Sequence, residues 1–137
     1  MPNLNELKRR ADELLKFCHC PYSNFRVAAV LEDSRGGLHT GVNVENASYG
    51  LTMCAERAAL FSAVASGARD FRRIFIHSPH GLPLPCGACR QVLAEFCDDS
   101  MEIIVDGNGQ TQRYILSELL PHGFSSRELE GSDGFLH

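Results

Sequence analysis

Three cysteines in two short motifs constrain this chain more than any other feature of its sequence. Cys54 begins the run Cys-Ala-Glu-Arg at residues 54–57, and Cys86 and Cys89 lie in the run Pro-Cys-Gly-Ala-Cys at residues 85–89. Two cysteines separated by two residues can bind one tetrahedral metal ion, and Cys54 supplies a third thiolate. A fold that uses these motifs must bring them together, and we expect one Zn²⁺ per chain bound by the three sulfurs.

Each of these cysteines falls at the start of a segment with helical character. Residues 54–65 favour a helix that stops at Gly67, and apolar spacing predicts a second helix from about residue 86 to residue 96. The positive end of a helix dipole lowers the pKa of a thiol, which favours the metal-binding thiolate. Three thiolates also weaken the acidity of a zinc ion, so positive charge must offset them, and Arg57 is the first candidate for that role.

Three protein ligands leave the fourth position of zinc open, as in a catalytic site. Glu56 directly follows the Cys54 motif and is the candidate proton carrier beside that position. Two simpler interpretations remain open. A Cys-x-x-Cys motif alone can be redox-active or structural, and a glutamate in a first helical turn can serve only to complement the dipole. A structural zinc site would take its fourth ligand from a histidine or from Cys18, Cys20 or Cys97, and it would leave Glu56 unexplained.

The remaining patterns predict an α/β fold. An amphipathic helix begins near Leu4 and is expected to continue to Cys18, and apolar runs separated by turn residues predict strands at 27–31, 38–44, 74–76, 103–105 and 112–115. Together with a short helix at 117–120, this order favours a three-layer α/β/α architecture with a mixed sheet of roughly five strands. We expect one domain over residues 1–137, with a loose C-terminal tail from about residue 125.

The charge pattern argues against a nucleic-acid or membrane partner. The net charge is −4, and basic residues cluster only at 8–10 and 72–73. No apolar run is long enough to span a bilayer, and the N-terminus lacks the features of a signal peptide. These observations predict a cytoplasmic protein.

Five ordered blocks of the chain resemble the cytidine deaminase family, in its small homotetrameric form with three cysteine ligands. The blocks are residues 22–25, 43–47, 54–57, 85–91, and 119–121 followed by Phe124. The resemblance implies hydrolytic deamination of cytidine and 2′-deoxycytidine to the uracil nucleosides with release of ammonia, as in pyrimidine salvage. It also implies a homotetramer.

The resemblance assigns roles to single residues. It implies that Glu56 shuttles protons and that Arg57 contacts a cysteine ligand. It also implies a set of substrate-binding residues: Phe25 against the pyrimidine, Asn43 and Glu45 on the ribose 3′-hydroxyl, Ala55 in the site, and Phe124 closing the site of a neighbouring subunit.

Departures from the family pattern concern substrate fit. Ala28 stands where the family commonly has glycine, and Gly50 and Thr52 alter the segment before Cys54. Deaminases of blasticidin S share the cysteine frame but resemble the chain less at residues 43–45, so they are a minor alternative. A deaminase that edits single-stranded nucleic acid should carry a basic channel, which this charge pattern does not predict.

Overall fold

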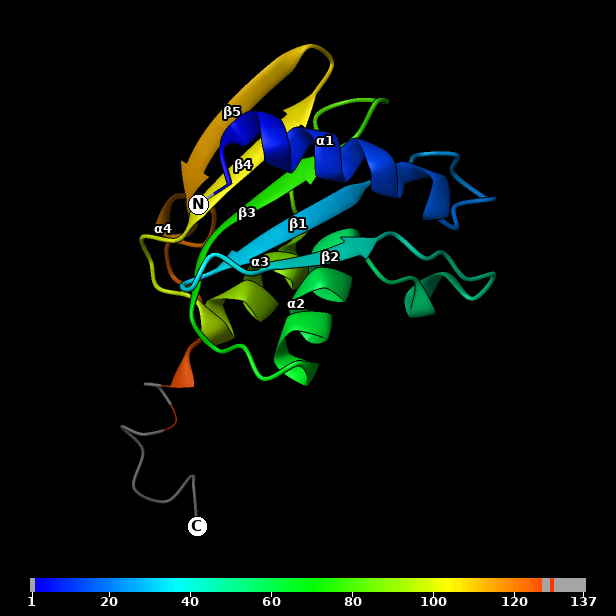
Figure 1. Cartoon of the computed structure of the whole chain (residues 1–137). Helices are drawn as coiled ribbons and strands as arrows, with labels where there is room; N and C mark the ends of the chain where they lie inside the picture. Colours follow the sequence, from blue (N-terminus) through cyan, green and yellow to red (C-terminus); the bar gives the residue numbers. More distant parts are fainter. Residues whose placement is uncertain (1, 127–128, 130–137) are drawn as a thin grey trace.

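A five-stranded mixed sheet forms the centre of the computed structural model, which describes residues 2–126 and 129 (Figure 1). Its strands are β1 (Ala28–Asp33), β2 (Leu38–Val42), β3 (Phe71–His77), β4 (Glu102–Gly107) and β5 (Gln110–Ile115). The order across the sheet is β2-β1-β3-β4-β5, in which β3 and β4 are parallel and the other neighbours antiparallel. This arrangement confirms the predicted mixed sheet. The tail predicted to be loose lies mostly outside the described residues.

Residue type decides where each strand lies in the sheet. The apolar strand β1 is buried along almost its whole length, as expected for a strand covered on both faces. The edge strand β5 alternates exposed and partly buried residues, which suits one solvated side. Asn108 and Gly109 join β4 to β5 with positive φ values of 55° and 72°, the backbone conformation that a tight hairpin turn requires.

Helices cover both faces of the sheet (Figure 1). Helix α1 (Leu4–Leu14) lies on one face, and α2 (Ala55–Ala65) and α3 (Gly87–Phe96) lie on the other. The short α4 (Leu116–Leu119) follows β5, and single 3₁₀ turns occupy η1 (Leu15–Phe17) and η2 (Tyr49–Leu51). The three-layer α/β/α architecture is therefore confirmed.

The first α-helix is shorter than its apolar spacing predicted. It ends at Leu14, and after η1 the backbone of Cys18 is extended. The next residue forms a bridge with Val44, and the His19 amide donates to the Asn43 carbonyl at 3.0 Å. This pairing with a distant segment overrides the helical pattern near Cys18.

Two hydrophobic clusters fill the space between the layers. The α1 side contains Ala28, whereas its strand neighbour Ala29 belongs to the cluster on the α2 and α3 side. The methyl group at Ala28 therefore packs under α1, on the sheet face opposite the cysteine motifs. The departure from the family pattern at this position concerns core packing rather than the candidate site.

Two buried carboxylates have basic side chains as partners. Glu32 is fully buried in β1, and Arg73 Nε donates to its Oε2 at 3.1 Å. Asp106 in β4 lies 2.7 Å from Nδ1 of His77, whose Nε2 lies 2.8 Å from Asp12 in α1. Both clusters link the sheet to other parts of the fold.

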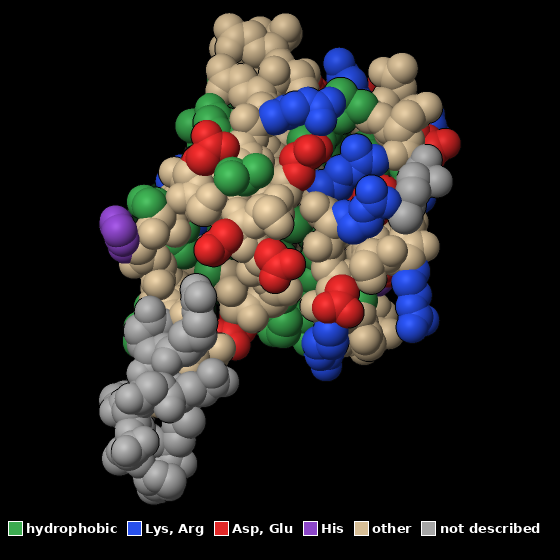
Figure 2. Space-filling model, turned by 90° about the vertical axis from the view of Figure 1, so that its left-hand side faces the viewer, with side chains coloured by type: hydrophobic (Ala, Val, Ile, Leu, Met, Phe, Trp, Pro, Cys, Tyr) green, Lys and Arg blue, Asp and Glu red, His purple; other side chains and the backbone are tan. Residues whose placement is uncertain are grey.

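The surface carries charges of both signs. On the face that Figure 2 shows, Lys and Arg side chains lie among Asp and Glu side chains rather than forming one continuous basic surface. Within residues 2–126 and 129, no helix is long and apolar enough to cross a membrane.

Candidate active site

The N-termini of α2 and α3 bring the three cysteine sulfurs together. Cys54 is the N-cap of α2, Cys86 is the N-cap of α3, and Cys89 lies in the first turn of α3. Cys86 Sγ lies 3.9 Å from Cys54 Sγ and 3.4 Å from Cys89 Sγ, and all three sulfurs lie within 4.8 Å of one another. A tetrahedral zinc ion with Zn–S bonds of about 2.3 Å separates its sulfurs by about 3.8 Å. The cluster therefore fits one zinc ion.

The cluster supplies three ligands and no more. Among the described residues it contains no fourth cysteine, histidine or carboxylate. Cys18 donates instead to the carbonyl of Val27 at 3.3 Å, and Cys97 lies just beyond the other end of α3. The geometry thus favours an open, catalytic zinc site over a closed structural one.

Positive charge lies next to the sulfurs. Arg57 Nη2 donates to Cys54 Sγ at 3.4 Å, which places this side chain where the charge argument requires it. A hydrogen bond with the Cys89 thiol, together with Arg57, lowers the pKa of Cys54 to about 5. The hydrogen bond with Cys54 and burial raise the pKa of the Cys89 thiol. These contacts therefore favour the thiolate form of Cys54, the form that binds metal.

Glu56 is a buried acid for which the described residues provide no ion-pair partner. It follows Ala55 in the first turn of α2 and is 5% exposed, and the described part of the chain gives it no salt bridge. Burial raises its pKa to about 7. A carboxyl group with such a pKa can both accept and return a proton at neutral pH.

A pocket of about 180 Å³ connects Glu56 with the cysteines. It lies where β2 ends and α2 begins, and the segment before α3 closes one side. Its lining residues are Phe25, Val27, Asn43, Thr52, Cys54, Ala55, Glu56, Pro83, Leu84 and Cys86. Six of the residues singled out from the sequence thus line one cavity, while Cys89 is buried.

Three of the lining residues, Val27, Pro83 and Leu84, were not predicted from the sequence, whereas Thr52, expected to affect substrate fit, does line the pocket. Pro83 and Leu84 lie within three residues of Cys86, so closeness to a zinc ligand could have indicated them. Val27 lies between Phe25 and β1, far in the sequence from the zinc ligands, so closeness to them could not have indicated it. Thr52 also accepts a hydrogen bond from the Asn46 amide at 3.1 Å, so it fixes the segment before α2.

Asn43 holds the segment that carries Phe25. Its Nδ2 donates to the Phe25 carbonyl at 2.7 Å, and its Oδ1 accepts from the Val27 amide at 3.1 Å. The Phe25 ring is half-buried, and the His80 ring lies behind it with 5.7 Å between ring centroids. The pocket wall opposite α2 is therefore fixed by hydrogen bonds to the backbone.

Glu45 lies outside the lining of this pocket. Its carboxylate accepts hydrogen bonds from the amides of Tyr22 and Ser23 at 3.1 and 3.2 Å and a short one from the Ser23 hydroxyl. These bonds, led by that from the Ser23 hydroxyl, lower the pKa of Glu45. A carboxylate can accept about four hydrogen bonds, so Glu45 keeps capacity for one more donor.

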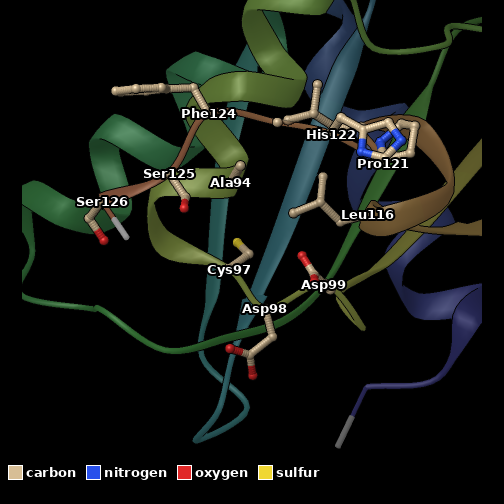
Figure 3. Close-up of a pocket in the computed structure, with 12 residues that line it drawn as sticks. Ala94, Cys97, Asp98, Asp99, Leu116, Pro121, His122, Phe124, Ser125 and Ser126 are labelled. Atoms are coloured by element: carbon tan, nitrogen blue, oxygen red, sulfur yellow. The ribbon is translucent and has the colours of Figure 1, made fainter. Parts of the chain in front are cut away.

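Phe124 also lies away from the pocket of its own chain. It lines a separate cavity of about 610 Å³ beyond the end of α3, which Cys97 and Leu116 also line (Figure 3). Its ring points away from Leu116 in this view and is 56% exposed, while Gln91 Nε2 donates to its carbonyl at 2.6 Å. Of the residues assigned from the sequence, Glu45 and Phe124 are the two that the structure places apart from the cavity and the zinc cluster.

Comparisons with known proteins agree with this site. Residues 1–105 match the family model described as the cytidine and deoxycytidylate deaminase zinc-binding region. A cytidine deaminase from Halalkalibacterium halodurans is 43% identical over 126 residues, which cover 90% of this chain and 95% of the relative. A probable cytidine deaminase from Dictyostelium discoideum is 42% identical over 93% of this chain and 89% of its own length.

The fold agrees as well. The crystal structure of cytidine deaminase from Burkholderia pseudomallei superposes with a TM-score of 0.85 and 41% identity, covering 90% of this chain and all of that one. Cytidine deaminase from Mycobacterium tuberculosis gives a TM-score of 0.78 at 34% identity, with 90% of this chain and 98% of that one covered. This chain therefore belongs to the cytidine and deoxycytidylate deaminase zinc-binding family.

Proposed function

We propose that this chain deaminates cytidine and 2′-deoxycytidine to uridine and 2′-deoxyuridine, with zinc held by Cys54, Cys86 and Cys89. The observation that carries the proposal is the position of Glu56, a buried acid with a raised pKa beside a three-thiolate cluster that has one open metal position. A structural zinc site needs no such acid. The relatives named as cytidine deaminases support this choice of substrate.

The roles within the pocket follow from its chemistry. Cys54, Cys86 and Cys89 would hold the zinc ion, which when bound would supply the Lewis acidity that activates a water molecule. Glu56 then passes one proton of the water to N3 of the pyrimidine and the other to the amino group on C4. The C4–O bond forms, the C4–N bond breaks, and ammonia leaves, so water and cytidine account for all atoms of uridine and ammonia. Phe25 and Ala55 hold the pyrimidine between the pocket walls.

Asn43 and Glu45 bind the ribose 3′-hydroxyl in this proposal. Asn43 lines the pocket, and the ionised carboxylate of Glu45 keeps capacity for one more donor. A 3′-phosphate would remove that donor and place a negative charge about 4 Å from Glu45. The two negative charges would repel each other.

We therefore expect kcat/KM for cytidine 3′-phosphate to lie well below that for cytidine, a ratio that steady-state assays measure. The 5′-monophosphate should lie between them, and internal cytosines of an oligonucleotide should react least. Equal kcat/KM for cytidine and its 3′-phosphate would remove Glu45 from the ribose site.

A homotetramer is part of the same proposal. Phe124 is exposed and lies apart from the pocket of its own chain, which supports a role in closing the site of a neighbouring subunit. Several other large apolar side chains are exposed and would be covered in an assembly: Phe17, Tyr49, Leu51 and Phe61. Sedimentation at assay concentrations tests this, and a fully active monomer would refute it. We place the enzyme in the cytoplasm and in pyrimidine salvage.

One assay tests the function as a whole. Absorbance change is followed with cytidine, 2′-deoxycytidine, cytosine and blasticidin S, and zinc is measured on the same sample. We expect turnover of both nucleosides at one zinc per chain and little reaction with free cytosine. Turnover of blasticidin S alone, or a zinc-loaded protein inactive on every substrate, would contradict the proposal.

A further inference from the structure

Gly41 lies where strand β2 touches the first turns of α2. A Cβ atom at this position would lie 2.4 Å from the carbonyl oxygen of Ala55, 2.4 Å from the amide nitrogen of Ala59 and 3.0 Å from the carbonyl carbon of Ala58. All three atoms belong to the backbone of α2. No side-chain rotation can therefore make room for a methyl group, and the helix or the strand would have to move.

The close contact explains this glycine better than backbone conformation does. The described glycines with positive φ are Gly36, Gly67 and Gly109, so Gly41 adopts a conformation open to other residues. Its cross-strand partner Ala29 is also small, is fully buried and packs in the cluster that contains Ala55. Glycine in a strand interior often marks such a close approach of backbones.

The elements that meet at Gly41 both lead into segments that line the pocket. The α2 side presents Cys54, Ala55 and Glu56, and Ala55 is also the residue whose carbonyl touches the Gly41 position. Two residues after Gly41, the same segment presents Asn43, which holds the Phe25 backbone at 2.7 Å. The spacing at Gly41 thus sets how far Glu56 and Cys54 lie from the wall that holds the substrate ring.

We propose that Gly41 is a positioning residue for catalysis, because its missing side chain fixes the depth at which the start of α2 lies against β2. A methyl group would need a displacement of about 1 Å to reach ordinary contact distance, and a misplacement of that size can cost about a hundredfold in rate. The inference rests on the proposed function of Glu56 and the cysteine cluster, and it adds a residue that touches neither metal nor substrate.

The test is Gly41→Ala, measured with the zinc-loaded and the cobalt-substituted protein. We expect kcat to fall by about 30- to 100-fold at one zinc per chain, while KM changes less than tenfold, because Asn43 and Phe25 stay with the strand side. The thiolate-to-cobalt absorption bands should shift, since Cys54 moves relative to Cys86 and Cys89. A kcat within threefold of the wild type, or an unchanged cobalt spectrum, would overturn the proposal.

Leu7→Ala is the matched control for general destabilisation. Leu7 is fully buried in the cluster under α1, on the opposite face of the sheet from α2. Its truncation should lower the thermal unfolding midpoint by about 10 °C and leave kcat per zinc within threefold at 20 °C. An equal loss of kcat in Leu7→Ala and Gly41→Ala would reduce the effect to stability and overturn the proposal.

A second variant covers the case in which Gly41→Ala does not fold. Ala29→Val adds volume beside Gly41, in the cluster that contains Ala55 and Ala59. It should lower kcat at least fivefold with zinc retained, and a kcat within twofold of wild type would count against the proposal. Failure of the proposed function looks different, because then the zinc-loaded wild-type protein would not turn over cytidine, or Glu56→Gln would leave turnover unchanged, whatever happens at Gly41.

Discussion

Two buried glutamates show how the same side chain serves two purposes in one small fold. Glu32, near the end of β1, is fully buried with Arg73 Nε 3.1 Å from its carboxylate. Glu56 lines the pocket, as does Val27, the residue that precedes β1. Among the described residues Glu56 has no ion-pair partner. Burial raises the pKa of Glu56 to about 7. A paired buried acid is part of the structure, whereas an unpaired one in a cavity points to chemistry.

The largest expected difference between the surroundings of Glu56 and those of Glu32 is that only the Glu56 site depends on zinc. Cys86→Ala removes one of three ligands, so zinc content should fall well below one per chain and turnover should be lost, because metal affinity depends on the full ligand set. Metal analysis and activity on the same sample measure this. Cys97→Ala, outside the cluster, is the control and should keep its zinc. Full zinc occupancy in Cys86→Ala would refute the ligand assignment.

Arg73→Met makes Glu32 resemble Glu56 by removing its closest cation. The unfolding free energy should fall by about 3 kcal/mol, the low end for breaking a buried pair, because Arg72 Nε still lies 3.9 Å away. Denaturant unfolding measures the change, and kcat should stay near the wild-type value. The double variant Glu32→Leu with Arg73→Met should recover most of the stability. A kcat that falls with Arg73→Met alone would break the distinction between the two glutamates.

A smaller effect is expected from Glu56→Gln on stability. The folded-state pKa of Glu56, about 7, lies above its ordinary value of 4.5, so the folded state holds the proton more tightly than the unfolded chain. The stability that Glu56 contributes is therefore present below about pH 4.5 and is lost as pH rises to about 7. In the metal-free protein at pH 8, Glu56→Gln should be about 2 kcal/mol more stable than wild type.

Unfolding measured at pH 5 and pH 8 checks the sign of this prediction. The advantage of Glu56→Gln should shrink toward pH 5, where the wild-type carboxyl group is protonated in the fold. The opposite trend, or a variant less stable at pH 8, would mean that the fold stabilises Glu56 in its charged form.

The sequence predicted most of the elements, because local patterns determine them. The hairpin of β1 and β2, the helix that starts at Cys54 and the strand at residues 74–76 all follow from apolar spacing and turn residues, and the structure confirms them. It also confirms Cys54 and Cys86 at helix starts. The metal ligands could be predicted for the same reason, because each motif is contiguous in the chain.

Contacts between distant segments could not be predicted in this way. The place of β1 between β2 and β3, the hydrogen bonds from Tyr22 and Ser23 to Glu45, and the contact of Gly41 with α2 all join residues far apart in the sequence. No local pattern encodes such pairings, because they depend on how complete elements pack. The burial that raises the pKa of Glu56 also depends on how distant segments pack, so it could not be predicted from the sequence.

Turnover by zinc-loaded Glu56→Gln tests the central claim most directly. The amide is nearly isosteric and cannot ferry a proton, so the variant should keep one zinc per chain and the wild-type fold while kcat for cytidine falls at least about a hundredfold. Zinc content, circular dichroism and kcat are measured on the same preparation. A zinc-loaded, folded Glu56→Gln protein with kcat within threefold of wild type would contradict the account, because another group would then carry the proton.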